Sequence, residues 1–323
     1  MEKIKQIPIV KKLGFNRIVL FAIMILMYII FCATIPGFFG PGRIMSILNY
    51  AYFLGFLALG VTFVIATGGI DFSIGPVMFC CALMAGYTFG TYHIPMVLAM
   101  LMSVAIGFLF GLFNGFMVSF IGIPPFIISM ASMNIAKGIA SVYTKTQSVQ
   151  WPQSASDGGW FRNIVKVGGF PVGLVVFICV VVILYIILNG TKAGRYILCL
   201  GSNREAVRLS GVNVKKWMML AYVICGTLVG IAALYYVAAY TTVQPGSGDQ
   251  YNNEAIASCV MGGTSMVGGL ASIGGTVLGT FIISLLQEGI LAYRLGKDIQ
   301  LIITGLIVIV FVYLDVSARR RKS

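Results

Sequence analysis

Long apolar runs, separated by short polar or glycine-rich connections, fill almost the whole of the 323-residue chain. About 20 apolar residues in a helix cross the hydrocarbon core of a bilayer. We therefore expect an all-α polytopic membrane protein of about ten transmembrane helices, forming one transmembrane domain over residues 1–323. The shortest and most marginal span is 252–269. The ten predicted spans are 17–36, 50–67, 76–91, 95–120, 124–143, 170–189, 216–240, 252–269, 271–292 and 298–315.

Composition agrees with this prediction. Hydrophobic residues make up 59% of the chain and charged residues 10%, and the mean hydropathy is +0.97. The surface of a soluble domain needs about 25–35% charged residues. Because no stretch is long and polar enough for a separate soluble domain, we expect no nucleotide-binding domain in this chain.

Residues 67–75 read TGGIDFSIG and interrupt the apolar pattern. Glycine disfavours a helix, and a charged group at membrane depth costs about 2.5–3.5 kcal/mol on insertion scales. Broken helices at that depth are tolerated only where the freed backbone groups are buried in protein or line a cavity. The segment therefore predicts part of a solute path or gate, with these candidate residues: Gly68, Gly69, Asp71 and Ser73.

Two roles stay open for Asp71. Its carboxylate can accept hydrogen bonds from solute hydroxyl groups, or it can cap the helix that restarts after the break. Asn114 and Asn134 are polar groups inside predicted spans, and each should face the interior of the helix bundle. There they would line the path or form an interhelical hydrogen bond.

Residues 262–269 read GGTSMVGG and echo the first glycine-rich segment. Glycine-interrupted segments at corresponding places in two halves of a chain point to a transport site. The echo predicts a weak internal repeat, of either parallel or inverted orientation, and two facing helix breaks. It adds Gly262 and Gly263 to the candidate path.

The net charge of +13 comes from three basic clusters, before the first span, in the connection around 192–216 and at 319–322. The positive-inside rule places all three clusters, and therefore both termini, in the cytoplasm. We interpret them as topology signals that touch anionic lipid, and expect no nucleic-acid partner. The seven cysteines lack metal-ligand spacing and His93 is the only histidine, so we expect neither a metal site nor an enzyme.

The connection at about 190–215 is too patterned for a spacer. Asn203 can cap a short helix that Gly211 ends. Ala206 and Leu209 would then lie on one side of it and the basic residues on another, so that the helix either seats in a groove of a partner protein or lies on lipid head groups. The residues assigned to this helix are Asn203, Arg204, Glu205, Ala206, Arg208 and Gly211.

Two further connections, 144–169 and 241–253, are expected on the extracytoplasmic side. The first contains Trp151 and Trp160, which we interpret as interface anchors or as residues that dock a partner. Glu254, which follows the second, is expected to be a charge at the start of a helix.

Three segments, in this order, resemble motifs of the permease subunits of bacterial ABC importers for ribose, galactose, xylose and related sugars. They are 67–75, 194–213 and 254–269, and the resemblance runs from about residue 40 to the end of the chain. Phe72-Ser73-Ile74 and Leu270-Ala271-Ser272 depart from the usual family pattern, so the solute stays open.

The resemblance implies a bacterial inner-membrane importer. A solute-binding protein would deliver the solute, and two permease subunits, identical or paralogous, would form the path. Two ATPase subunits would receive the short helix around 203–211 and would hold the ATP and magnesium, so this chain itself would need no cofactor.

A stand-alone transporter driven by an ion gradient is the alternative, because broken helices fit it equally well. It needs ionisable groups for coupling. The candidates are Asp71, Lys137, Glu254 and Glu288.

Overall fold

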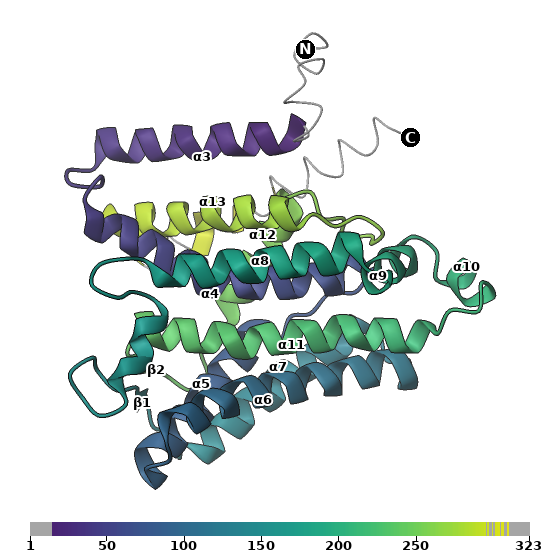
Figure 1. The fold of residues 1–323 in the computed structure, drawn as a ribbon, viewed down its shortest axis with the longest axis horizontal. Coiled ribbons are helices and arrows are strands. Elements are labelled where there is room, and N and C mark those ends of the chain that lie inside the picture. Colours follow the sequence, from purple (N-terminus) through teal and green to yellow (C-terminus); the bar gives the residue numbers. More distant parts are fainter. Residues whose placement is uncertain are drawn as a thin grey trace.

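The structure is a computed structural model that describes residues 15–294, 296, 299, 301–303, 305, 306 and 309. Long helices lie side by side with their axes roughly aligned, so that the bundle has two opposite ends (Figure 1). Helices α9 and α10 lie at one end, and the short strands β1 and β2 lie at the other. The elements are α3 (Phe15–Thr34), α4 (Pro41–Ala66), α5 (Ile74–Tyr92), α6 (Met96–Phe116), the π-helix η1 (Met117–Ile121), α7 (Pro125–Tyr143), β1 (Val149–Gln150), the 3-10 helix η2 (Gly159–Ile164), α8 (Val172–Gly190), α9 (Lys192–Ser202), α10 (Arg204–Leu209), α11 (Val214–Ala239), β2 (Thr242–Val243), α12 (Asp249–Met261) and α13 (Ile273–Ala292).

The predicted all-α membrane fold is confirmed. Within the described part of the chain, eight helices are long and apolar enough to cross a membrane. Each corresponds to a predicted span, although α4 begins earlier than expected, because Pro41 suits the first turn of a helix. The prediction of a span at 252–269 is wrong: α12 ends at Met261 and is about 20 Å long. The tenth span, 298–315, falls largely outside the described residues.

Helix α4 is the centre of the bundle. Buried residues make up 89% of its span, against 6% for α3. Helix α4 packs against α11, α12 and α13, whereas the main neighbour of α3 is α13. Helices α6 and α11 approach closely, because a Cβ built on Gly107 would overlap the carbonyl oxygen of Gly226.

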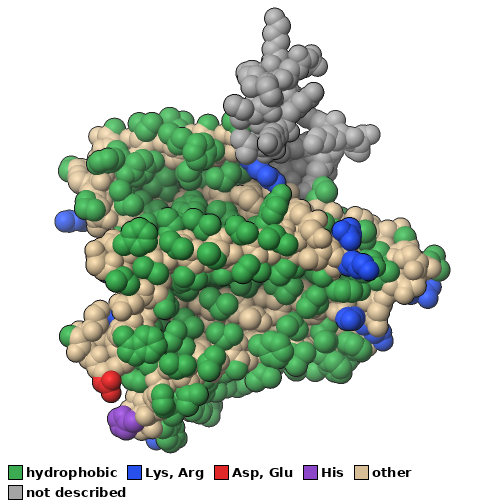
Figure 2. Space-filling view, in the orientation of Figure 1, with side chains coloured by type: hydrophobic (Ala, Val, Ile, Leu, Met, Phe, Trp, Pro, Cys, Tyr) green, Lys and Arg blue, Asp and Glu red, His purple; other side chains and the backbone are tan. Residues whose placement is uncertain are grey.

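The outer faces of the bundle are apolar. Figure 2 shows hydrophobic side chains spread over the long helices, with Lys and Arg gathered mainly near the α9–α10 end. Leu26, Leu101 and Ile186, from α3, α6 and α8, are all exposed. Such a surface is stable against lipid tails and unstable in water, so the protein is embedded in a membrane.

Strands β1 and β2 join the two connections at the opposite end, pairing Val149 with Val243 in antiparallel register. Trp151, next to β1, is buried, and its indole nitrogen donates a hydrogen bond to the carbonyl of Ala82 in α5 at 3.1 Å. The predictions of an interface anchor or a docking residue are therefore wrong for Trp151. Trp160 is 52% exposed and stays available for either role.

Candidate functional site

The first helix break lies between Ala66, the last residue of α4, and Ile74, the first of α5. One carboxylate oxygen of Asp71 accepts hydrogen bonds from the backbone nitrogen and the hydroxyl of Ser73, at 2.8 and 2.6 Å. Asp71 is 4% exposed. Its carboxylate therefore folds back onto Ser73, the residue immediately before α5, and both predicted roles of Asp71 stay open.

Helices α6 and α7 complete this polar cluster. The Asn114 amide donates to the Ser73 hydroxyl at 3.1 Å and reaches the other oxygen of Asp71 at 3.5 Å. The hydroxyl of Ser132 in turn donates to the side-chain oxygen of Asn114. Three of the predicted path residues, Asp71, Ser73 and Asn114, thus lie together, and Ser132 is a member that the sequence prediction missed.

Asn134 does not join them. It lies on an exposed face of α7, so the prediction that it faces the bundle interior is wrong. The physical reason is helical geometry: Ser132 points inward, and two residues further the helix has turned by about 200°. Asn134 therefore points away from the subunit at membrane depth.

The second break lies between Met261 and Ile273 and contains no ionisable side chain. Gly262 packs directly on α13, because a Cβ built on Gly275 would overlap the Gly262 carbonyl oxygen. The Ser272 hydroxyl caps α13 by accepting from the Gly275 nitrogen at 3.0 Å. Thr264 accepts from the Ser272 nitrogen at 3.3 Å. Close packing and hydroxyl groups hold this break.

The two breaks meet, as the echo predicted. The Gly269 nitrogen donates to the carbonyl of Ala66 at 3.0 Å. A Cβ on Gly268 would lie 2.8 Å from the Gly68 nitrogen. Side chains at these positions would force the segments apart, so glycine is required on both sides. Of the other predicted glycines, a Cβ built on Gly69 would lie 2.7 Å from the Tyr222 hydroxyl oxygen, whereas a Cβ built on Gly263 would have no atom within 4 Å.

A third segment enters the same contact. A Cβ on Gly201, in α9, would overlap both the Ala66 carbonyl and the Gly269 nitrogen. We call Gly68, Gly201, Gly268 and Gly269 the glycine junction. It joins the two breaks to α9, and only Asn203 separates α9 from α10.

The predicted short helix is confirmed as α10. The Asn203 side-chain oxygen accepts from the Ala206 nitrogen at 3.0 Å, and Gly211 has a φ of +80° just after the helix. An Arg208–Glu205 ion pair with an N–O distance of 2.5 Å lies on its surface, and the guanidinium lowers the pKa of the Glu205 carboxyl. Leu209 is 74% exposed, so an apolar side chain faces away from the fold.

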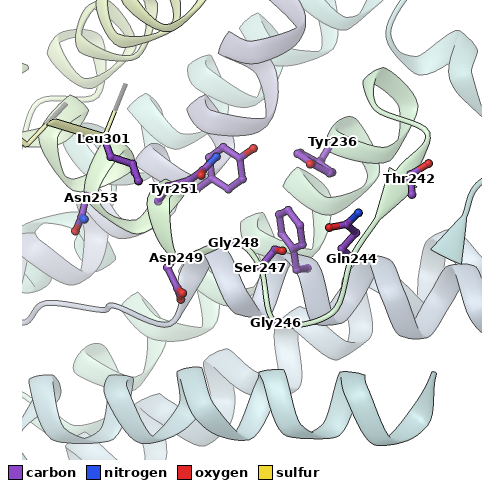
Figure 3. A pocket seen from close by; sticks show the side chains of 12 residues that line it. Tyr236, Thr242, Gln244, Gly246, Ser247, Gly248, Asp249, Tyr251, Asn253 and Leu301 are labelled. Carbon is purple, nitrogen blue, oxygen red and sulfur yellow. The ribbon is translucent and has the colours of Figure 1, made fainter. Parts of the chain in front are cut away.

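A cavity of about 550 Å³ lies at the other end of the bundle (Figure 3). That volume is within the usual range for small-molecule sites. The rings of Phe79, Tyr236 and Tyr251 are part of its lining, and none of the described residues that line it is Lys or Arg. Hydroxyl, amide and carboxylate groups line the rest, from Thr242, Gln244, Ser247, Asp249, Gln250 and Asn253.

An aromatic cluster closes the floor of the cavity. The Tyr251 ring lies 5.1 Å from that of Phe53 and 5.9 Å from those of Phe79 and Tyr236. Behind it the buried Glu254 carboxylate accepts from the Tyr50 hydroxyl at 2.7 Å. Glu254 therefore points into the bundle, instead of being a charge at the start of a helix.

The remaining ionisable candidates are paired. The Gln287 amide also donates to Glu254, at 2.8 Å. Lys137 pairs with Asp249 at 2.7 Å and links α7 to the first residue of α12, beside the cavity. Glu288 pairs with Arg43 at 3.2 Å.

The cavity was not predicted from the sequence, and residues 241–253 were expected only as a connection on the extracytoplasmic side. A usable signal was present: tyrosines at 235, 236 and 240 are followed closely by amides at 244, 250, 252 and 253. Across the residues that the structure places, no group of three or more His, Cys, Asp or Glu could hold a metal ion.

Comparison with known proteins decides the family. Residues 43–312 match the family described as the branched-chain amino acid transport system permease component. The chain belongs to this permease family. The permease is 31% identical over 298 residues to the ribose import permease protein RbsC of Escherichia coli K12, covering 92% of each chain. It is also 31% identical to RbsC of Bacillus subtilis strain 168, covering 89% of this chain and 88% of that one.

A third relative is the fructose import permease protein FruG of Bifidobacterium longum, 31% identical over 91% of the permease and 88% of FruG. No solved structure gives a significant match. Family membership confirms the identification that the three sequence motifs indicated.

Proposed function

We propose that this permease is the membrane subunit of an ATP-binding-cassette importer and forms the translocation path for a monosaccharide. The observation that carries the proposal is the glycine junction. Through it, α9 contacts both helix breaks directly, and α10 follows α9 after one residue. A force applied to α10 from outside the bundle would therefore reach both breaks. The relatives named ribose and fructose import permeases support the same function.

Helix α10 is the surface that we assign to the ATPase subunits. It lies beyond the ends of the long helices (Figure 1). Its exposed Leu209 and its Glu205–Arg208 pair offer an apolar contact beside two charges, which suits a groove in a partner. ATP and magnesium would bind to those separate subunits, and this chain would need no cofactor.

The positive-inside rule supports the orientation. Lys192, Arg195, Lys215 and Lys216 lie at or beside the α9–α10 end, which we therefore assign to the cytoplasm of a bacterium, with the bundle in its inner membrane. The cavity then opens on the outer side, where a solute-binding protein would deliver its ligand. The basic residues at 3–12 and 319–322 lie outside the described residues, so cytoplasmic termini stay a prediction.

The lining of the cavity supports a neutral, hydroxyl-rich solute. Ring faces carry negative charge density that attracts the C–H groups of a sugar ring, and Tyr236, Tyr251 and Phe79 offer such rings. Gln244 and Asn253 supply amide donors and acceptors for hydroxyl groups. No Lys or Arg is among the described lining residues, and Lys137 beside the cavity is already paired with Asp249, so these residues offer an anionic sugar phosphate no unpaired cation.

A second permease subunit, identical or paralogous, belongs to the proposal. Asn134 is a polar group exposed at membrane depth, where a hydrogen-bond partner on another helix would stabilise it. The gradient-driven alternative has no such support. Its four candidate coupling groups, Asp71, Lys137, Glu254 and Glu288, all have hydrogen-bond or ion-pair partners inside the subunit.

The test of the mechanism is uptake of labelled ribose and fructose by proteoliposomes that contain the permease, its ATPase subunits and its binding protein. We expect uptake of at least one sugar, and its loss when the ATPase is inactivated. Glu205→Ala and Arg208→Ala should separate ATP hydrolysis from uptake while membrane insertion is retained. Uptake that persists with the inactive ATPase, or unchanged coupling in both variants, would contradict the proposal.

The cavity has a test of its own. The double variant Gln244→Ala, Asn253→Ala removes two exposed amides and should raise the KM for uptake about tenfold, since each lost hydrogen bond is worth about 0.5–1.5 kcal/mol. Gln147→Ala, an exposed amide outside the lining, is the matched control and should leave KM unchanged. Equal KM values in all three proteins would exclude the cavity from the path.

A further inference from the structure

A cluster of basic and aromatic side chains lies where α9 meets the start of α11, apart from the cavity and from α10. We name it the basic–aromatic edge, and its members are Lys192, Arg195, Tyr196, Lys215, Lys216 and Trp217. The four cationic side chains are exposed, and the two rings are partly buried. In Figure 2 basic side chains gather near this end, beside apolar surface.

Helix α9 holds one side of the edge in place. Its Gly194, Ile197 and Leu200 are buried, whereas Lys192 and Arg195 are exposed. The apolar face of α9 packs on α8, α11 and α4, so its cationic face is turned outward. Because α9 directly follows the membrane-spanning helix α8, the edge lies at the end of the spans, where lipid head groups begin.

The aromatic rings bridge α9 and α11. The Tyr196 and Trp217 rings lie 5.1 Å apart, and the Lys216 ammonium lies 5.3 Å from the centre of the Trp217 ring. Tyr and Trp are enriched at the head-group level, because one end of each side chain is apolar and the other is polar. The first contact links the two helices, and the second places a cation beside an amphipathic ring.

An apolar surface for acyl chains adjoins the edge. The Lys215 ammonium lies 5.4 Å from the centre of the Phe120 ring, and Phe120 stacks on Phe116 at 5.3 Å. Both phenylalanines, and Ile121 beside them, are exposed. A ligand with an anionic head and apolar tails would satisfy both parts of this surface.

The charges at the edge have no acidic partner among the placed residues. None of the ion pairs that the structure describes includes any of the four cations. The connection 190–217 holds six Lys or Arg residues and one acidic residue, Glu205, which pairs with Arg208. Within the described part of the chain, these four cations are therefore free to bind an anionic ligand.

We propose that the basic–aromatic edge is a binding site for an anionic phospholipid, such as phosphatidylglycerol. Lys215, Lys216 and Arg195 hold the phosphate, Tyr196 and Trp217 lie at the level of the glycerol backbone, and the acyl chains lie on Phe116 and Phe120. This goes beyond the proposed transport function and does not depend on it. Basic pockets between membrane helices on the cytoplasmic side are known to take lipid head groups of this kind.

The test is native mass spectrometry of the full-length permease alone, released from nanodiscs of equal parts phosphatidylglycerol and phosphatidylcholine. We expect wild-type protein to retain phosphatidylglycerol in preference to phosphatidylcholine. The variant Lys215→Gln, Lys216→Gln should lower that retention about 30-fold, since each cation near the membrane surface is worth about 1 kcal/mol. The matched control Lys145→Gln, Lys166→Gln removes two exposed charges at the opposite end and should retain wild-type lipid.

A conservative variant tests whether any loss of lipid in the Gln variant is due to misfolding. Lys215→Arg, Lys216→Arg keeps both charges and should retain phosphatidylglycerol as wild-type does. Melting temperature gives a second readout: added phosphatidylglycerol should raise it in the wild-type and Arg proteins but not in the Gln protein. Equal retention of both lipids by wild-type protein would overturn the proposal. Unchanged lipid retention in the Gln variant would also overturn the proposal, even if that variant bound the ATPase subunits more weakly.

Discussion

Each of the two helix breaks contains its own pair of adjacent glycines, and the two breaks meet at the glycine junction. Different interactions nevertheless stabilise them. In the first, a buried carboxylate, Asp71, gathers hydrogen bonds from Ser73 and Asn114. In the second, the backbone of Gly262 packs directly against Gly275, and no ionisable group is present. The same local sequence signature thus marks where a helix ends without specifying what stabilises the end.

The neighbours of each break explain the difference. The first break lies against α6 and α7, which bring Asn114 and Ser132 to it from distant parts of the chain. The second joins α12 and α13, which pack on each other directly. A polar network tolerates small movements, because hydrogen bonds can re-form, whereas backbone packing tolerates no added atom. Variants at four positions, from the largest expected effect to the smallest, test this comparison.

Gly275→Val should have the largest effect, because its Cβ would overlap the carbonyl oxygen of Gly262. We expect α12 and α13 to separate at a cost above about 3 kcal/mol, measured as a fall in melting temperature in detergent. Gly274→Val is the control, since its Cβ would come no closer than 3.8 Å to Arg17. Equal melting temperatures would show that packing does not hold the second break.

Gly201→Ala adds one methyl group where both breaks meet, so it should disturb them together. Overpacking of this kind costs about 1–3 kcal/mol, and ATP-driven uptake should fall further than stability does. Gly138→Ala, with open space around its Cβ, should match wild-type protein. Normal uptake by the Gly201 variant would show that the contact of α9 with the helix breaks is not needed for transport.

Asp71 variants distinguish the two predicted roles of the carboxylate. Asp71→Ala leaves the Ser73 and Asn114 donors without their acceptor, at about 1–3 kcal/mol, whereas Asp71→Asn keeps one acceptor oxygen. If Asp71 holds the break, uptake should follow melting temperature in both variants. A raised KM in the Asn variant at unchanged melting temperature would instead indicate direct contact with the solute.

Thr264→Val should have the smallest effect. It removes only the acceptor for the Ser272 nitrogen, which is worth about 1 kcal/mol in melting experiments. The control is Thr227→Val, whose hydroxyl bonds to its own helix. A loss as large as that of Gly275→Val would mean that hydroxyl groups, not packing, dominate the second break.

Local features of the site were predictable from the sequence. Asn203 caps α10 because its short polar side chain reaches a backbone nitrogen three residues later. Gly68 follows the end of α4 with a φ of +80°, a conformation that glycine adopts easily, so this reason also lies within a few residues. Asn134 and 252–269 were predicted wrongly, because the first depends on which face of α7 is covered and the second on where a glycine turn stops a helix short of the membrane thickness.

The sequence by itself determined that the chain crosses a membrane, where its helices break and which family it resembles. Hydrophobicity and local backbone preferences are properties of short segments, and they survive without tertiary contacts. Only the tertiary structure decided which side chains meet: Gly201 with both breaks, Tyr251 with Phe79 and Tyr236, and Trp151 with α5. In a membrane helix almost every face is apolar, so periodicity does not distinguish the face that packs on protein from the face that meets lipid.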